Sequence, residues 1–179
     1  EQQFDTLYQL AYLQALKRLV KQNQPEQVDH FVHVLPKALH YNAEIIAEYC
    51  RYLITHEQTQ QAEKILHEQL SKQFNEKLMT LYGLAAYSIT QLQFAESLMK
   101  KNANSAALFL CLGKISRANQ LWGKAKTYLE QSLTINPTAE AYTELGELYE
   151  TLDDPTEACT AYRKGLLLVN HANSTFSVR

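Results

Sequence analysis

The fold is decided by the stretch from Ala106 to Val169, which reads AALFLCLGKISRANQLWGKAKTYLEQSLTINPTAEAYTELGELYETLDDPTEACTAYRKGLLLV. Two equal intervals lie within it: Gly113 stands twelve residues before Ala125, and Gly146 stands twelve before Ala158. Small residues at matched places on two antiparallel helices let the backbones approach closely. We therefore predict two consecutive helical hairpins in which Gly113 faces Ala125 and Gly146 faces Ala158.

The same interval continues upstream in weaker copies. Gly83 stands twelve residues before Ala95, and Cys50 stands twelve before Ala62. Successive alanines of this set are 33, 30 and 33 residues apart, close to the ~34-residue tetratricopeptide period. Large residues keep register with the small ones: Ile46, Met79, Phe109 and Tyr142, then Tyr49, Tyr82, Leu112 and Leu145, then Leu66, Met99, Leu129 and Tyr162.

These intervals predict an all-α protein, a tetratricopeptide-like right-handed superhelix of about ten antiparallel helices in five hairpins. One helical-repeat domain should cover residues 1–169, with a degenerate first pair or cap at 1–41, repeats at 42–74, 75–103, 104–137 and 138–169, and a loose tail at 170–179. Pro36 predicts a helix break, and Asn42 and Asp154 predict helix starts. The alternative is a non-repetitive bundle whose apolar residues recur because helices are amphipathic.

Composition narrows the class of protein. The chain has 179 residues and a net charge of −2. A general nucleic-acid binder needs a basic stripe, so this charge argues against that function. Five glycines and four prolines favour helix nearly throughout. The cysteines Cys50, Cys111 and Cys159 are odd in number and fall at expected packing positions, so a disulfide framework is not expected. The chain lacks an initiating Met and a signal-like segment, so we expect a soluble piece of a longer protein.

The sequence offers no catalytic constellation. His30 and His33 have a spacing that can present two imidazoles to a metal, yet no further ligand is placed beside them, and a solvated pair is the favoured interpretation. His67 and Glu68 lack the second histidine of a zinc-protease helix. No nucleophile elbow, phosphate loop or dinucleotide fingerprint is present. We predict that the protein is not an enzyme and uses neither a metal nor a cofactor.

A partner-binding groove is expected along the first helices of the hairpins. The geometry of such arrays puts cations in the middle of the groove, at Arg51, Lys114 and Arg117, and mostly acidic residues toward its C-terminal end, at Glu140, Thr143, Glu147 and Glu150. Tyr8, Tyr12 and Tyr87 add aromatic surface. Zones of both signs suit a charged peptide or partner helix. The alternative is an ordinary solvated face.

Several segments resemble the C-terminal repeat region of the bacterial HemY family. They are Leu81-Tyr82-Gly83, Leu112-Gly113, Asn119 to Ala125, Tyr128-Leu129-Glu130 and Tyr162 to Leu166, within a match over roughly residues 78–168. The resemblance implies a parent protein held in the bacterial inner membrane by N-terminal helices, with the repeats on the cytoplasmic side. It also implies a link to late heme and porphyrin biosynthesis, so a heme-biosynthesis enzyme is the implied partner.

Three functions follow from this combination, in descending order of expectation. The first is a non-enzymatic scaffold that holds a protein or peptide partner. The second is a carrier of porphyrin or heme, in which Cys50, Cys111, Cys159, His67 or a groove tyrosine ligates iron. The third is a purely structural oligomerisation module.

Overall fold

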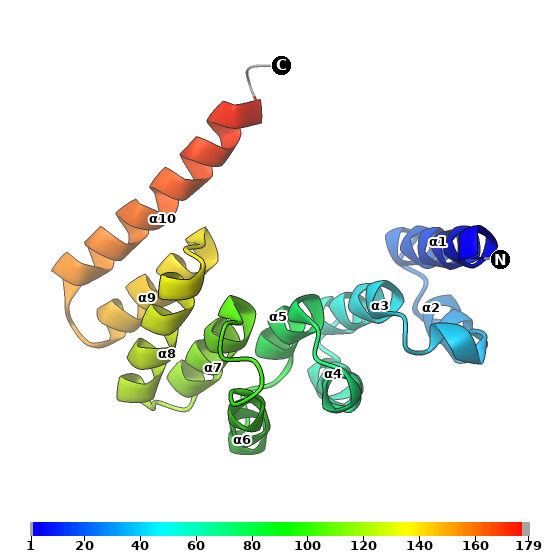
Figure 1. Ribbon diagram of the computed structural model, residues 1–179, viewed down its shortest axis with the longest axis horizontal. Coiled ribbons are helices and arrows are strands. Elements are labelled where there is room, and N and C mark those ends of the chain that lie inside the picture. The colour runs from blue at the N-terminus through cyan, green and yellow to red at the C-terminus, as the bar shows by residue number, and fades with distance from the viewer. Residues whose placement is uncertain (1, 177–179) are drawn as a thin grey trace. The chain divides into compact units, whose positions relative to one another are not determined.

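A computed structural model describes residues 2–176, and every regular element in that range is a helix (Figure 1). The all-α prediction is therefore confirmed for the described residues. The elements are α1 (Gln2–Lys21), α2 (Pro25–His33), the 3-10 helix η1 (Lys37–Leu39), α3 (Ala43–Thr55), α4 (Thr59–Lys72), α5 (Glu76–Ala85), α6 (Ile89–Leu98), α7 (Ala106–Ala118), α8 (Trp122–Ile135), α9 (Ala139–Thr151) and α10 (Pro155–Phe176).

The chain divides into two compact units, one up to Ala85 and one from Ala86 onward. In the first unit α1 packs on α2 and α3, α3 packs on α4 and α5, and α4 packs on α5. In the second unit each helix packs on the next one along the chain, from α6 to α10. The boundary falls inside the expected repeat 75–103, so α5 belongs to the first unit and α6 to the second. A single domain at 1–169 stays a prediction.

Four turns between helices share one backbone feature that the sequence intervals did not reveal. Asn23, Glu57, Gln120 and Asp153 have positive φ angles of 52°, 62°, 59° and 59°. Each residue lies two positions before the start of the second helix of a pair: α2, α4, α8 or α10. A left-handed residue turns the chain back sharply, and side chains other than glycine adopt it at a cost. The first pair, α1 and α2, thus has the same turn as the regular hairpins.

Helix starts and breaks follow the sequence closely. The side chain of Asn42 accepts hydrogen bonds from the backbone N–H groups of Glu44 and Ile45, at 3.0 and 3.2 Å. Asp154 accepts one from Glu157 N at 3.1 Å. Both predicted caps are therefore confirmed. The break at Pro36 is also confirmed, because α2 ends at His33 and the chain continues as η1.

The end of the chain differs from expectation. A loose tail was expected from position 170, but α10 continues as helix to Phe176. No Pro or Gly follows Gly165, so nothing in the sequence forces the helix to stop. The remaining positions, 177–179, lie outside the described residues.

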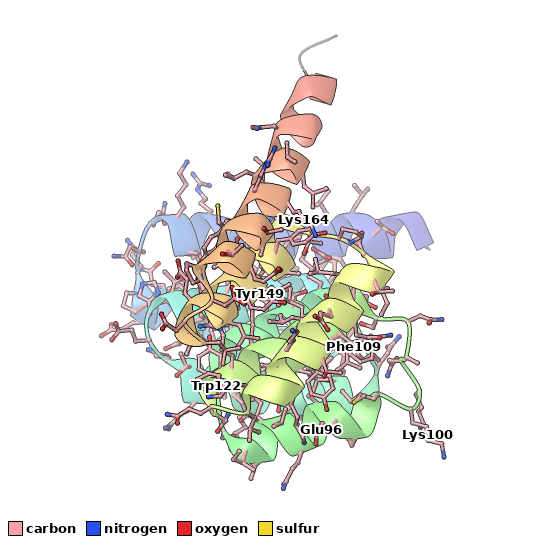
Figure 2. All side chains as sticks on the ribbon, turned by 90° about the vertical axis from the view of Figure 1, so that its left-hand side faces the viewer. Glu96, Lys100, Phe109, Trp122, Tyr149 and Lys164 are labelled. Atoms are coloured by element: carbon pink, nitrogen blue, oxygen red, sulfur yellow. The ribbon has the colours of Figure 1, made fainter. Side chains whose placement is uncertain are left out.

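Apolar residues from α7, α8, α9 and α10 form one core cluster in the second unit. Its buried members are Leu110, Ala125, Leu129, Ala141, Leu145, Leu148, Tyr149, Ala158 and Ala161. Trp122, at the start of α8 and labelled in Figure 2, packs partly buried against this cluster. The apolar stripes of successive helices thus cover one another, as a repeat array requires.

The glycines of the two hairpins lie at close helix crossings. A Cβ atom built at Gly113 would lie 2.6 Å from Leu129 Cδ2, and one built at Gly146 would overlap the ring of Tyr162. Leu129 and Tyr162 each lie four residues after the expected alanine, so the nearest atoms belong to the large residue one helical turn beyond it. Ala125 and Ala158 are buried in the core beside these contacts, and their direct facing of the glycines stays a prediction.

We expect Gly113→Ala and Gly146→Ala to lower the free energy of unfolding by about 1–3 kcal/mol, because the added methyl group displaces Leu129 or Tyr162. Gly123→Ala is the matched control, since a Cβ there meets no atom within 4 Å. It should stabilise the protein by about 0.4–1 kcal/mol through lower chain entropy when unfolded. Urea unfolding of the three variants checks the ranking, and equal effects at Gly113 and Gly123 would contradict the close crossing.

Candidate protein-binding face

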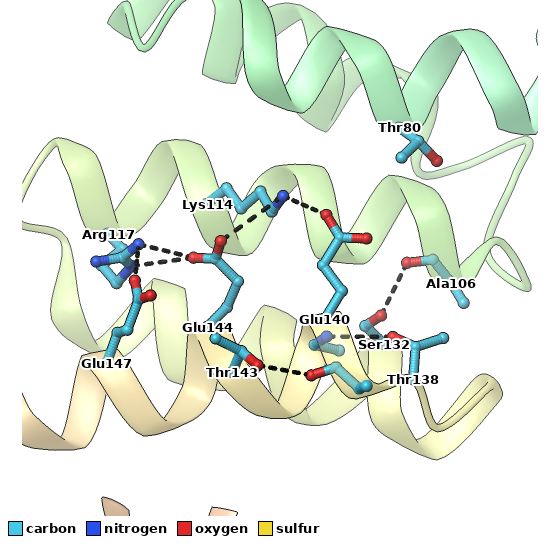
Figure 3. A network of polar contacts seen from close by, with 12 residues as sticks. Thr80, Ala106, Lys114, Arg117, Ser132, Thr138, Glu140, Thr143, Glu144 and Glu147 are labelled. Atoms are coloured by element: carbon cyan, nitrogen blue, oxygen red, sulfur yellow. Dashed lines mark hydrogen bonds and ion pairs between the residues drawn. The ribbon is translucent and has the colours of Figure 1, made fainter. Parts of the chain in front are cut away.

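Five charged side chains lie together on the first helices of the last two hairpins (Figure 3). Lys114 and Arg117 are three residues apart on α7, and Glu140, Glu144 and Glu147 follow at intervals of four and three on α9. Residues at these spacings share one side of a helix. The two helices therefore present opposite charges to each other within the second unit.

Lys114 is the most buried of the five, with 7% of its side chain exposed. Its Nζ lies 2.5 Å from Glu140 Oε1 and 3.6 Å from Glu144 Oε1. A buried ammonium group is tolerated only when carboxylates or other acceptors compensate for its lost hydration. The two α9 carboxylates provide that compensation.

Arg117 continues the contact along α9. Its Nη2 lies 2.8 Å from Glu144 Oε2 and 2.6 Å from Glu147 Oε2. Its Nε also donates a hydrogen bond to Glu144 Oε2, at 3.2 Å. Glu144 thus bridges the two cations, and the five side chains form a ladder between the hairpins. We call this surface the α7–α9 face.

The exposed atoms of the α7–α9 face belong mainly to carboxylates. The side chains of Glu140 and Glu147 are 46% and 42% exposed, whereas that of Arg117 is 29% exposed. Two cations face three carboxylates, so the ladder carries one excess negative charge. A separate positive zone in the middle of the groove was expected from Lys114 and Arg117. In the second unit these cations are instead neutralised by α9.

The other expected groove residues have separate surroundings. Thr143 is exposed on α9, and its hydroxyl donates to the carbonyl oxygen of Ala139 in its own helix, at 2.9 Å. Glu150 of α9 forms a hydrogen bond with Tyr162 of α10. Burial and this hydrogen bond raise the pKa of Tyr162 to about 12. Arg51 belongs to the first unit, where it pairs with Glu48 of its own helix at 2.8 Å. Their roles in partner binding stay predictions.

Sequence reasoning missed Glu144, the residue that bridges both cations. The signal was available, because Glu144 lies four residues after Glu140 and three before Glu147 on the same side of a helix. Extrapolating the groove residues one by one did not show that carboxylates and cations from adjacent hairpins would pair.

The expected aromatic residues fall in both units. Tyr8 and Tyr12 contact each other on α1, with their hydroxyl oxygens 3.2 Å apart. Tyr87 is exposed at the start of the second unit, and its carbonyl oxygen accepts a hydrogen bond from Asn119 at 2.8 Å.

The candidate iron or metal ligands are scattered. Burial raises the pKa of the Cys50 thiol to about 12 and raises that of Cys111 as well, so both stay protonated. Cys159 is exposed, which differs from the packing position expected for it. His67 Nδ1 lies 3.3 Å from Tyr82 Oη in the first unit.

Among the side chains that the structure describes, residues 6–170, no group of three or more His, Cys, Asp or Glu is placed to hold a metal ion. His30 and His33 are exposed on α2. No helix in the same range combines the length and apolar character needed to cross a lipid bilayer.

Comparison with known proteins identifies the repeat. The family model described as tetratricopeptide repeat matches residues 139–168, which hold α9 and most of α10. Residues 139–168 are thus matched to the tetratricopeptide repeat family. No curated protein matches the chain.

Solved structures of tetratricopeptide type share the fold. A thermophilic tetratricopeptide protein from Thermus thermophilus, TTC0263, has a TM-score of 0.62 and 20% identity, over 92% of this chain and 99% of that one. MamA residues 41-end from Desulfovibrio magneticus RS-1 has a TM-score of 0.61 and 15% identity, over 91% and 96%. At such identities the likeness concerns the fold alone. It confirms the predicted tetratricopeptide-like helical repeat.

We expect Lys114→Met to lower the free energy of unfolding by about 1–2 kcal/mol, because Glu140 and Glu144 lose their buried partner and repel each other. Lys126→Met is the matched control: Lys126 is exposed on α8, and its Nζ lies 4.0 Å from Glu130 Oε1 and 5.3 Å from the centre of the Tyr149 ring. That exposed pair should contribute less than about 0.5 kcal/mol. Thermal melts of both variants test the difference, and equal melting temperatures would show that the ladder adds nothing to stability.

Proposed function

We propose that this protein is a non-enzymatic scaffold that binds a protein partner on the α7–α9 face. The observation that carries the proposal is the ladder itself, in which Lys114 and Arg117 of α7 hold Glu140 and Glu147 half exposed at fixed positions on α9. Tetratricopeptide-type arrays expose extended surfaces of this kind and use them for binding. Side chains held in place by ion pairs lose less freedom when a partner docks.

The charge of the face indicates the partner's chemistry. Lys114 is buried and Arg117 is 29% exposed, whereas Glu140 and Glu147 are 46% and 42% exposed and Thr143 is exposed between them. A segment with Lys or Arg side chains complements this surface better than an acidic one. We propose that Glu150 and Arg51 also contact the partner, and that Arg51 does so from the first unit alone. The competing interpretation is a solvated face with no partner.

We further propose that the parent protein is HemY-like. On this proposal it is anchored in the bacterial inner membrane with these repeats on the cytoplasmic side, and its partner is an enzyme of late heme biosynthesis. The support is the resemblance of the segments Leu81-Tyr82-Gly83, Asn119 to Ala125 and Tyr162 to Leu166. The second of these segments spans the turn before α8 and the first residues of that helix.

We expect Thr143→Arg to reduce recovery of the partner by about tenfold, because a fixed cation between Glu140 and Glu147 repels a basic segment. The side chain of Thr143 bonds only within α9, so the fold should tolerate the change. The immobilised 179-residue chain is incubated with detergent extracts of bacterial membranes that contain the heme-biosynthesis enzymes, and recovered proteins are quantified by mass spectrometry.

Two controls accompany this experiment. Thr143→Val keeps the size of the side chain without adding charge, and should recover the partner as the unchanged protein does. Thr160→Arg puts the same cation at an exposed position of α10, outside the α7–α9 face, and should also leave recovery unchanged. Equal recovery with Thr143→Arg and Thr143→Val would remove the α7–α9 face from the proposal. Recovery without any heme-biosynthesis enzyme would remove the HemY-like assignment alone.

We expect hemin titration to give no saturable shift of the Soret band that depends on His or Cys. Cys50 and Cys111 are buried thiols with raised pKa values, and iron coordination by cysteine needs a thiolate. Absorption spectra are recorded for the unchanged protein and for Cys159→Ser and His67→Ala. A one-to-one shift that either substitution abolishes would favour the porphyrin carrier over the scaffold.

A further inference from the structure

The helix α10 is longer than its counterpart in the preceding hairpin. Both α8 and α10 begin three residues before the alanine of their hairpin, Ala125 or Ala158, but α8 has 14 residues and α10 has 22. Gly165 of α10 packs beside Ala139, the first residue of α9, because a Cβ atom built at Gly165 would lie 3.3 Å from the Ala139 carbonyl oxygen. The last turns of α10 therefore continue past the start of α9 (Figure 1).

The part of α10 that continues past α9 begins with four apolar residues in a row, from Leu166 to Val169. The residues Leu166, Leu167 and Val169 are 65%, 49% and 44% exposed. Successive side chains of a helix point in directions about 100° apart, so this segment is apolar around most of its circumference. A helix that is apolar on all sides is normally buried, and a few turns of helix are only marginally stable alone in water. The segment therefore calls for a covering partner.

The helix α8 shows what covers the same positions in the preceding hairpin. Leu133, 33 residues before Leu166, packs against the core cluster that includes Tyr149 of α9. Lys126, 33 residues before Cys159, has its Nζ 5.3 Å from the centre of the Tyr149 ring. On α10 the corresponding Leu166 and Cys159 are exposed. The face by which α8 receives the first helix of the next hairpin is thus repeated on α10, where it is open to solvent.

The helix α1 carries a matching extension at its opposite end. Both α1 and α9 end two residues before the left-handed residue of their turn, Asn23 or Asp153, but α1 has 20 residues and α9 has 13. The additional residues of α1 therefore lie at its N-terminal end. Exposed apolar residues occur within this extension and just after it: Leu7, Tyr8 and Leu10 are 64%, 48% and 49% exposed.

The two extensions lie at the ends that stacking would bring together. The short connection 136–138 joins α8 to α9, so the C-terminal end of α8 lies beside the N-terminal end of α9. If α1 of a second copy packed on α10 as α9 packs on α8, the C-terminal extension of α10 would lie beside the N-terminal extension of α1. The exposed apolar residues of both extensions would then be removed from water together.

Charge favours α1 over a second α10 as the helix that covers this face. Residues 6–16 of α1 include no charged side chain, so the exposed cations Arg163 and Lys164 of α10 would meet no like charge there. Two α10 helices paired through Leu166 and Leu167 would instead bring Arg163 and Lys164 of both copies close together. Juxtaposed like charges disfavour an interface.

We propose that this protein self-associates head to tail, with α10 of one copy receiving α1 of a second copy. The contact continues, from one chain to the next, the stacking that joins α8 to α9. Because the two contacting faces are different, such an interface produces rings or open chains of copies. The proposal goes beyond the scaffold function and does not involve the α7–α9 face.

Sedimentation velocity of the full 179-residue chain, at about 1–300 µM, measures the self-association. We expect the mean mass to rise with concentration. Leu166→Glu and Leu7→Glu should each raise the dissociation constant more than about tenfold, because each puts a charge into an apolar contact. Leu152→Glu is the matched control: Leu152 is 43% exposed at the end of α9, outside the proposed contact, and its variant should associate as the unchanged protein does. Circular dichroism verifies that all three variants keep their helices.

Disulfide cross-linking identifies the helices in contact. Cys50 and Cys111 are buried, so Cys159→Ser leaves no exposed thiol. Two variants are made on that background, Ala11→Cys in α1 and Leu167→Cys in α10. Oxidation of their equimolar mixture should give mainly the mixed dimer, identified by mass spectrometry. A chain that carries both cysteines should give a ladder of larger species.

The control for cross-linking uses an exposed position of α4. Lys64→Cys replaces Ala11→Cys in the mixture and should give no more mixed dimer than random collision of monomers does. Equal yields of mixed dimer with the two variants would show that the cross-link reports no specific contact.

Three further results would overturn the proposal. One is a monomer at every concentration tested, and another is unchanged association of Leu7→Glu. The third is efficient dimerisation of Leu167→Cys alone, which would show that α10 pairs with α10 of the second copy. None of these measurements needs a partner protein, so their failure is distinguishable from failure of the capture experiment with Thr143→Arg.

Discussion

The hairpins of the second unit depend on a large side chain seated against a glycine. Leu129 of α8 occupies the space at Gly113 of α7, and Tyr162 of α10 occupies the space at Gly146 of α9. Without a Cβ atom at these positions the helices approach closely, and the alanines beside the crossing complete the core. This contact fixes which side of α7 and of α9 remains outside. The position of the charged ladder therefore depends on apolar contacts that other residues of α7 and α9 make.

The proposed binding surface is built from regular helices of the second unit. Its charged side chains are held at helical intervals across α7 and α9 by ion pairs. On the proposal made above, the half-exposed carboxylates Glu140 and Glu147 favour a partner that carries basic groups.

The sequence predicted the class of fold, the hairpin spacing and several boundaries because these depend on local signals. Asp154 caps α10, and Pro36 interrupts the chain after α2, wherever the helices lie in space. The residue facing Gly113 depends on how one helix slides along another. Spacing within the chain does not determine that slide, so the contact of Leu129 with Gly113 was not predicted. The pairing of Lys114 with α9 carboxylates was missed for a related reason, since it joins residues of different hairpins. The link to heme biosynthesis depends on resemblance and stays a prediction.

The ladder joins two hairpins to each other and does not close either one. Its ion pairs therefore link α7 to α9, and the attraction between the two helices depends on the charge of the α9 carboxylates. A bound partner that draws Glu140 or Glu147 away from its cation would weaken these ion pairs, and the two hairpins could then move more freely against each other. The same ion pairs would thus influence both partner binding and the flexibility of the repeat array.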